Sequence, residues 1–385
     1  MIGRLREQSR VREALEHYPV VVLLGPRQCG KSTLARAICE QASGAFFDLE
    51  DPACPLKTES ARYILDSARG LVVLDEIQHQ PELFPLLRVL ADRPGTPCRF
   101  LLLGSASPQV VGHASESLAG RAAMLSLGGF DLSEAGPDNF RSLWVRGGFP
   151  RSWLAATDPL SMDWRTNFVR TFLERDIPAL GIRVPAATLR RFWTMVAHFH
   201  GQIWNAAEFA RSMGTQEATA KHYLDILSST YVLRVLPPWH ENLGKRLVKS
   251  PRVYFRDSGL LHFFFQTSTE LDILSHPRAG ASWEGFAIEQ ILSLLGEQEN
   301  AWFYRTQAGA ELDLMVMLGG KRYGFEFKLS DHPATTRSMT VAMQDLDLER
   351  LFLVHPGSGR VALREKVERL GIQSLPQALG EIGAH

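Results

Sequence analysis

One short segment constrains the fold of this chain more than any other. Residues 25–32 read G-P-R-Q-C-G-K-S and fit the pattern G-x-x-x-x-G-K-[S/T] at every fixed position. The apolar run 20–24 before it predicts a buried strand, and residues 34–38 after it predict the first turns of a helix. Backbone N–H groups at such a strand–loop–helix junction face an anion, so the segment predicts a phosphate-binding loop.

The fixed positions of this loop each have an expected role. Gly25 and Gly30 let the backbone bend and approach a phosphate closely. We expect Lys31 to reach the β- and γ-phosphates, and Ser32 to offer its hydroxyl to Mg²⁺. ATP is the expected nucleotide, because the chain has no guanine-reading N-K-x-D motif. The residues expected to contact it are Gly25, Pro26, Arg27, Gln28, Cys29, Gly30, Lys31, Ser32 and Thr33.

A second apolar run, residues 71–74, leads directly into Asp75 and Glu76. A strand that brings an acidic pair to its carboxyl end is typical of a Walker B motif. We expect Asp75 to hold Mg²⁺, largely through water, and Glu76 to polarise the attacking water. A glycine turn beside an unrelated surface acidic pair is the alternative, and the order of the two motifs disfavours it.

Composition limits the remaining possibilities. A chain of 385 residues is long enough for about two or three domains. Its 42 basic and 42 acidic residues leave no net charge, so any binding to nucleic acid must use a local patch. The four cysteines form no C-x-x-C pair, which predicts reduced thiols and no zinc site. The first residues lack the apolar core of a signal peptide and no apolar run has membrane-spanning length, so we expect a cytoplasmic protein with no membrane partner.

Residues 187–262 have the pattern of a winged helix. Apolar spacing predicts helices over 189–199, 206–213 and a third stretch after Thr215, and β-rich runs follow at 231–236 and 252–255. In a DNA reader the second helix of the helix–turn–helix, here the one after Thr215, enters the major groove. Basic side chains along the wing contact phosphates. A solvated basic loop and a subunit interface are the alternatives. The residues expected to contact DNA are Lys221, Lys245, Arg246, Lys249 and Arg252.

The last hundred residues carry a second chemical signal. Residues 310–316 alternate polar and apolar side chains, and a Gly-Gly turn separates them from a second strand-like run at 323–329. Asp313 on one strand, with Glu326 and Lys328 on the next, gives the arrangement of PD-(D/E)xK nucleases, and Glu284 on a preceding helix could complete it. Asp313 and Glu326 would ligate Mg²⁺ for phosphodiester cleavage. The leading proline of the motif is absent, and a cross-strand ion-pair ladder is the alternative.

These segments together resemble a family of prokaryotic AAA-type (AAA+ or STAND-like) ATPases that join a P-loop core to a C-terminal nuclease-like domain. The resemblance rests on residues 25–32, 74–78, 103–106, 118–121, 174–176, 254–260 and 310–328. It covers nearly the whole chain and implies an α/β fold in four parts. The expected parts are an AAA-type P-loop core at 1–130, a helical lid at 131–186, the winged helix at 187–262 and a restriction-endonuclease-like α/β domain at 263–385.

The resemblance also implies roles for two further residues. Ser105, after the apolar run 99–103, matches a polar sensor of the γ-phosphate; capping of the following helix is the alternative. Arg121, just before another apolar run, matches an arginine finger that reaches a neighbouring subunit's site; a plain surface arginine is the alternative. A finger of this kind implies a homo-oligomeric ring, such as a hexamer.

Two functions from different classes agree with these patterns. In the first, the chain is an ATP-driven motor that binds DNA, branched DNA included, and remodels it or translocates along it. In the second, it is a nucleotide-dependent switch in a defence or regulatory system that acts through a protein partner. The complete pair Asp75 and Glu76 favours turnover, and therefore the first function.

Overall fold

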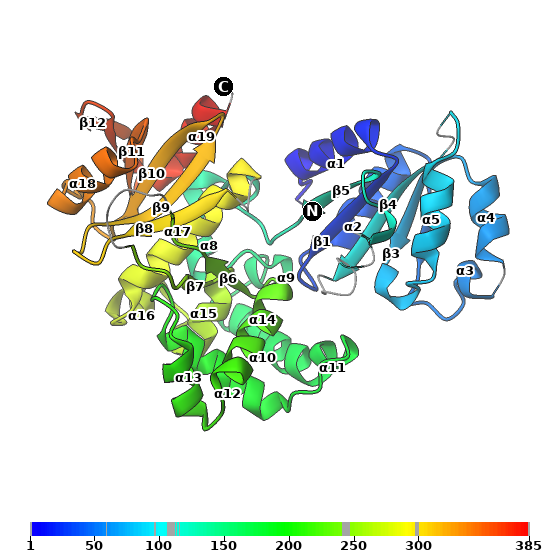
Figure 1. The fold of residues 1–385 in the computed structure, drawn as a ribbon, viewed down its shortest axis with the longest axis horizontal. Helices are drawn as coiled ribbons and strands as arrows, with labels where there is room; N and C mark the ends of the chain where they lie inside the picture. Colours follow the sequence, from blue (N-terminus) through cyan, green and yellow to red (C-terminus); the bar gives the residue numbers. More distant parts are fainter. Residues whose placement is uncertain are drawn as a thin grey trace. The chain divides into compact units, whose positions relative to one another are not determined.

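The computed structural model describes residues 2–58, 60–95, 98–105, 112, 114, 116–240, 247–296 and 300–383 (Figure 1). Two compact units make up the chain. The first contains residues 1–129 and 229–231, and the second contains residues 130–228 and 232–385. Apart from residues 229–231, the segments expected to form the lid, the winged helix and the C-terminal domain belong to the second unit, and the boundaries between them remain predictions.

The first unit is built on a five-stranded parallel sheet in the order β2-β3-β4-β1-β5 (Figure 1). Every residue of β1 is buried, as expected for a strand that has helices on both faces of its sheet. The strands are β1 (Val20–Gly25), β2 (Ala45–Asp48), β3 (Gly70–Asp75), β4 (Cys98–Ser105) and β5 (Ala122–Ser126). The helices are α1 (Leu5–His17), α2 (Lys31–Gln41), α3 (Pro55–Thr58), α4 (Ala61–Ser67) and α5 (Leu83–Ala91).

Alternate residues of the strands pack on opposite layers of helices. Val20, Val22 and Leu24 of β1 lie in one core cluster with Leu65 of α4 and Phe84 of α5. Helices α1 and α2 contact β1 from the other layer. Because strands β1 and β3 both end at the carboxyl edge of the sheet, Gly25 and Asp75 are brought to the same edge.

The second unit begins with helices and ends with a mixed sheet (Figure 1). Its six-stranded sheet has the order β12-β13-β11-β10-β9-β8 and combines parallel with antiparallel pairs. The strands of this sheet are β8 (Ala301–Arg305), β9 (Glu311–Leu318), β10 (Lys321–Phe327), β11 (Arg350–His355), β12 (Arg360–Arg364) and β13 (Val367–Gly371). The helices outside the 186–255 region are α7 (Leu132–Ala135), α8 (Phe140–Arg146), α9 (Pro150–Trp153), α10 (Asp158–Thr171), α11 (Ile177–Ala179), α15 (Ser258–Phe265), α16 (Glu270–Ser275), α17 (Ala279–Leu295), α18 (Arg337–Asp345) and α19 (Leu375–Gly383), with a π-helical segment at Phe172–Asp176.

The described residues between 186 and 255 form three helices and a pair of strands. Asn205 caps the second helix by accepting a hydrogen bond from the Glu208 N–H (3.3 Å), and Gly214 ends it in the left-handed conformation (φ 67°). The elements are α12 (Ala186–His198), α13 (Ala206–Met213), α14 (Glu217–Ser229) and the antiparallel strands β6 (Leu233–Leu236) and β7 (Arg252–Phe255).

Both ends of the connection between β6 and β7 pair with the edge strand β8. The Trp239 N–H donates to the Phe303 carbonyl (2.7 Å), and the Phe303 N–H donates to the Pro237 carbonyl (3.0 Å). On the far side of residues 241–246, which lie outside the described residues, the Val248 N–H donates to the Arg305 carbonyl (3.1 Å). The segment expected to form the wing therefore covers a sheet edge that would otherwise carry free backbone groups.

A neutral histidine joins α8, α15 and α17 in the core of the second unit. His262 is buried, and its Nδ1 lies 3.0 Å from the Val145 carbonyl, which can only accept. Nδ1 therefore carries the proton, and Nε2 accepts from the Ser282 hydroxyl at 2.7 Å. The same hydroxyl oxygen accepts from the Trp144 indole N–H at 2.9 Å. Burial lowers the pKa of His262 to about 3, so the ring stays neutral in the folded chain.

His262→Gln gives a pH-dependent prediction. We expect the variant to unfold more easily at pH 7, because the Ser282 hydroxyl loses its acceptor and the Val145 carbonyl loses one of its two donors. The folded pKa lies below the unfolded value, so the wild type loses stability as pH falls below about 6.5, and the variant does not share that loss. The difference in unfolding free energy between the wild type and His262→Gln should therefore shrink by about 2 kcal/mol as the pH falls from 7 to 5. Urea denaturation at the two pH values measures it. His222→Gln, on an exposed face of α14, is the surface control. A difference that grows as pH falls would contradict a neutral His262.

Candidate functional site

The predicted phosphate loop joins β1 to α2, as expected from the sequence. Gln28 (φ 65°) and Gly30 (φ 99°) adopt the left-handed conformation, and α2 begins at Lys31. The Lys31 side chain is 5% exposed, and its ammonium donates to the carbonyls of Gly25 (3.0 Å) and Pro26 (2.9 Å). The loop therefore curls around the ammonium group that is expected to reach the phosphates.

The chain that follows β5 closes tightly on the start of the loop. The Leu127 N–H donates to the Leu24 carbonyl (2.8 Å), and a Cβ on Gly25 would lie 2.1 Å from the Leu127 carbonyl oxygen. The thiol of Cys29, also buried, lies 3.5 Å from that same oxygen. This close approach leaves no room for a side chain at position 25, so glycine is required there.

Arg4 supports the loop from the N-terminal segment. Its guanidinium donates to the carbonyls of Cys29 (3.0 Å), Gly128 (3.2 Å) and Gly129 (3.1 Å), so it ties the loop to the chain after β5. Arg4 has φ 46°, a conformation that is costly for a residue other than glycine. Sequence reasoning missed this residue, because nothing local to Arg4 signals a contact with residues 25 and more positions away.

The two predicted Mg²⁺ ligands meet at the carboxyl edge of the sheet. Asp75 is 4% exposed, and burial raises the pKa of its carboxyl group, while a hydrogen bond with Ser32 opposes that shift. Asp48, at the end of β2, lies in register with Asp75 and raises its pKa further; sequence reasoning did not single it out. A hydroxyl and a carboxylate are hard oxygen donors, so Ser32 and Asp75 fit a Mg²⁺ ion that takes its other ligands from phosphate and water.

Glu76 is held in an unusual conformation beside this pair. It has φ 54° and ψ 51°, and its N–H donates to the Asp75 carboxylate (3.0 Å) before a 3₁₀ turn over Ile77–His79. The Gln78 side chain donates to the Glu76 carboxylate, and among the described residues the buried Gln78 Oε1 has no partner. Strain of this kind is common at functional positions. Sequence reasoning assigned no role to Gln78, although it lies two residues from Glu76.

Ser105 and Arg121 lie at opposite edges of the sheet. Ser105 is the last residue of β4 and pairs with Gly25, whereas its side chain lies outside the described residues. Arg121 precedes β5, next to the start of β1, at the amino edge. Its guanidinium donates to both carboxylate oxygens of Asp92 (2.6 and 2.9 Å), which lowers the pKa of Asp92. Arg121 is therefore far from the phosphate loop of its own chain, and its role as a finger in a neighbouring copy remains a prediction.

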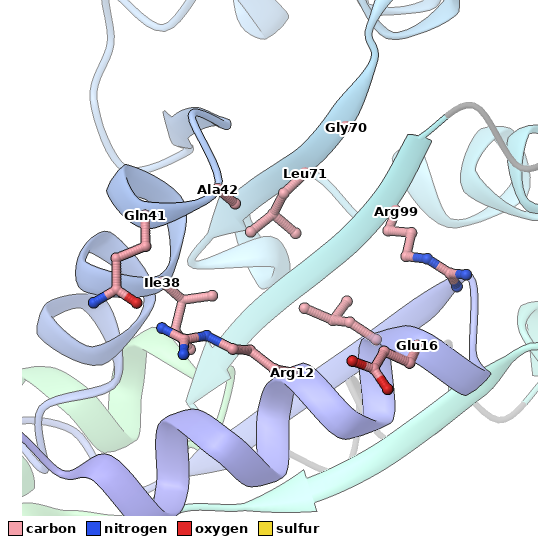
Figure 2. Close-up of a pocket in the computed structure, with 9 residues that line it drawn as sticks. Arg12, Glu16, Ile38, Gln41, Ala42, Gly70, Leu71 and Arg99 are labelled. Atoms are coloured by element: carbon pink, nitrogen blue, oxygen red, sulfur yellow. The ribbon is translucent and has the colours of Figure 1, made fainter.

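A hollow of about 610 Å³ lies at the same amino edge, between α1, α2 and the first residues of β3 and β4 (Figure 2). Arg12 and Glu16 of α1 and Arg99 of β4 surround an apolar floor that includes Ile38 and Leu71. It contains none of the predicted site residues, so the nucleotide site and this hollow are separate features of the first unit.

In the second unit, the four residues predicted for a nuclease-like site converge. Asp313 of β9 accepts from the Phe327 N–H (3.2 Å), Lys328 donates to Glu326 (3.0 Å), and Tyr254 donates to Glu284 of α17 (2.5 Å). Burial, followed by the charge of Asp313, raises the pKa of Glu284 and that of Glu326 to about 8 each.

A guanidinium also lies in this cluster, and it overturns one DNA-binding prediction. Arg252 is 4% exposed, and its Nη1 lies 3.3 Å from Glu284 Oε1 and 3.4 Å from Asp313 Oδ1. Its Nη2 contacts Glu311. The prediction that Arg252 contacts DNA is wrong for this fold, because strand β7 turns the side chain into the interior. Lys221 and Lys249 are exposed, and Lys245 and Arg246 lie outside the described residues.

The acidic cluster does not fit a metal ion as it stands. Across the part of the chain that the structure describes, no group of three or more His, Cys, Asp or Glu side chains is arranged to hold one.

Among the described residues, no helix combines the length and the apolar character needed to cross a membrane.

Residues 17–136 match a family model described as an AAA domain. Residues 137–271 and 279–375 match two models described as domains of unknown function, DUF8612 and DUF4143. Two proteins described as uncharacterized, Mb2031c of Mycobacterium bovis and Rv2008c of Mycobacterium tuberculosis, are each 47% identical to this chain over 367 residues. These alignments cover 95% of this chain and 83% of each relative. The chain belongs to the family of these mycobacterial proteins.

A solved structure extends the comparison to the fold. The Walker-type ATPase PABY2304 of Pyrococcus abyssi matches with a TM-score of 0.50 and 15% identity, over 69% of this chain and 96% of that one. A branch migration motor, RuvB of Thermotoga maritima, matches over 61% of this chain and 90% of its own with 19% identity, and its TM-score of 0.29 supports no inference. The match to an AAA domain, the phosphate loop and the parallel sheet agree with this fold. The first unit is therefore an AAA-type P-loop ATPase domain.

Gly25→Ala tests the close approach at the loop. We expect the variant to lose about 1–3 kcal/mol of unfolding free energy, because the new methyl group would overlap the Leu127 carbonyl. Urea denaturation measures the loss. Gly128→Ala is the matched control: a Cβ there would meet no atom within 4 Å, so its unfolding free energy should change by less than about 0.5 kcal/mol. Equal effects of the two substitutions would mean that Leu127 does not constrain position 25.

Proposed function

We propose that this chain hydrolyses ATP with Mg²⁺ at the loop of residues 25–32. The interaction of Ser32 with the buried Asp75, next to the buried Lys31, is what best supports the proposal. It links the hydroxyl of the phosphate loop to the carboxylate of the predicted Walker B strand, close to Lys31, although Asp75 lies far from Lys31 and Ser32 in sequence. A buried lysine next to two hard oxygen donors suits a nucleotide phosphate and its Mg²⁺.

Each side chain of the site has a task in this reaction. Lys31 exchanges its two carbonyl partners for phosphate oxygens, Ser32 and Asp75 orient the Mg²⁺ ion, and Glu76 polarises the attacking water. Bound Mg²⁺ neutralises charge that develops on the phosphates. Gln78 fixes the Glu76 carboxylate through one end of its amide, and its buried Oε1 is left to accept a hydrogen bond from water.

Lys31→Ala and Glu76→Gln separate binding from turnover. We expect Lys31→Ala to lose ATP binding, because it removes the ammonium from the phosphate loop. Glu76→Gln should bind ATP like the wild type and hydrolyse it about a hundredfold more slowly, because the amide cannot polarise water. Binding is measured with a fluorescent ATP analogue, and turnover by phosphate release. Glu82→Gln, which alters an exposed acidic residue after the same strand, should change neither. Normal turnover by Glu76→Gln would remove Glu76 from its role.

The wider assembly is also a proposal. A neighbouring copy would supply Arg121 to the site, which fits its position at the sheet edge opposite the phosphate loop. Helices α12–α14 with the strand pair β6–β7 support a winged-helix interpretation, and exposed Lys221 and Lys249 could contact DNA phosphates together with Lys245 and Arg246. Such a ring would use ATP to remodel DNA, branched DNA included, or to translocate along it.

A nucleotide-dependent switch that acts through a protein partner is the second candidate. The burial of Arg252 favours it, because one of the five residues proposed to contact DNA points into the interior. The pairing of this segment with β8 on both sides also commits backbone groups that a free wing would present to DNA.

ATPase rates with and without DNA distinguish the two candidates. For a DNA motor we expect one of duplex, single-stranded or four-way-junction DNA to raise the steady-state rate several-fold, because DNA contact would couple to turnover. Light scattering in the same buffer should give the mass of a ring. Lys221→Glu with Lys249→Glu should weaken the stimulation and leave the basal rate unchanged.

Mixing two inactive variants tests whether the ring shares its sites. Arg121→Ala retains Glu76, and Glu76→Gln retains Arg121, so mixed rings should regain activity if the arginine acts across subunits. A slow rate that no DNA changes, with a monomer's mass, would contradict the motor and favour the switch.

A further inference from the structure

The acidic cluster of the second unit, formed by Glu284, Glu311, Asp313 and Glu326, already holds a cation from the chain itself. The Arg252 guanidinium lies between three of these carboxylates: Nη1 is 3.3 Å from Glu284 and 3.4 Å from Asp313, and Nη2 contacts Glu311. The fourth, Glu326, is paired with Lys328 at 3.0 Å. Each carboxylate that would ligate a metal therefore has a positively charged partner.

Two of these carboxylates also accept a hydrogen bond from an uncharged donor. Asp313 Oδ2 accepts from the Phe327 N–H (3.2 Å), and Glu284 Oε1 accepts from the Tyr254 hydroxyl (2.5 Å) as well as from Arg252. A divalent ion would have to displace a buried guanidinium and break several of these bonds. Placing such an ion beside a fixed positive charge is costly in a region of low dielectric constant.

Arg252 connects elements that are distant in sequence. It is the first residue of β7, pairs with Leu236 of β6 and bridges Ile203 in front of α13. Its side chain reaches α17 through Glu284 and β9 through Glu311 and Asp313, and it lies over the Phe303 ring of β8, 4.9 Å from the centroid. A planar guanidinium suits this position, because it can bond several carboxylates at once and stack on an aromatic ring.

We propose that Arg252 takes the place that a metal ion occupies in an active nuclease of this arrangement. The cluster is then an ion-pair joint that fastens strand β7 to α17 and to the C-terminal sheet, and it is closed to divalent cations in the intact chain. This inference does not depend on ATP hydrolysis at the first unit. It implies that the second unit cuts no phosphodiester bond through Asp313 and Glu326.

Cation binding tests the first half of the proposal. Mn²⁺ is titrated into the nucleotide-free chain, and bound Mn²⁺ is counted by electron paramagnetic resonance. Wild type and Asp313→Asn should bind the same number of ions with the same affinity, because the cluster accepts none. An ion that the wild type binds and Asp313→Asn does not would overturn the proposal, whatever happens to other variants.

Hydrogen exchange tests the joint. In Arg252→Met, which keeps much of the stem but removes the charge, amides of β7 and β9 should exchange at least about tenfold faster, because the carboxylates are left unpaired. In Arg252→Lys these amides should exchange at rates between those of the wild type and those of Arg252→Met, because one ammonium cannot bond all three carboxylates. Lys249→Met, an equivalent change at an exposed position three residues earlier, should leave these rates unchanged. If Arg252→Met folds and exchanges like the wild type, Arg252 is not a joint.

Discussion

The phosphate loop depends on the approach of the Leu127 carbonyl to Gly25. Strand β1 lies between β4 and β5, and the chain leaving β5 passes so close to the loop that position 25 has no room for a side chain. Arg4 then crosses from the N-terminal segment and bonds carbonyls on both sides of this contact. The loop is therefore shaped by three separate segments, and its glycine serves packing as much as phosphate access.

Buried charge organises the second unit in a comparable way. Arg165 of α10 donates to the carbonyls of Val145 and Gly259, and burial lowers its pKa to about 10. Asp257 caps α15 and also accepts from the Gly148 N–H at 2.8 Å. Together with Arg252, these side chains join helices and strands that are distant in sequence. Buried groups of this kind are costly if one partner is lost, which makes the arrangement specific.

The sequence predicted features that local pattern determines. The strand–loop–helix of residues 20–38 and the strand ending at Asp75 follow from contiguous runs, and the structure has both. Strand alternation and the turn also placed Glu326 with Lys328 on one strand face and Asp313 on the neighbouring strand, whereas Glu284 on its helix was added from the nuclease pattern. What local pattern could not predict is which distant group fills a site. Arg252 stands in a basic, proline-containing stretch that reads as exposed, and its burial is decided by acidic residues 32 to 61 positions later. Arg4 and Asp48 escaped notice for the same reason.

The pairing of the β6–β7 connection with β8 has a consequence for the order in which the chain can be completed. The backbone groups of Pro237, Trp239 and Val248 find their partners only in residues 303–305. During synthesis, the helices α12–α14 and the strands β6 and β7 emerge well before those partners exist. The backbone groups of the β6–β7 connection and the guanidinium of Arg252 can bond only after α17 and strands β8 and β9 have been made. This part of the second unit is therefore completed late, together with residues that follow it in the chain.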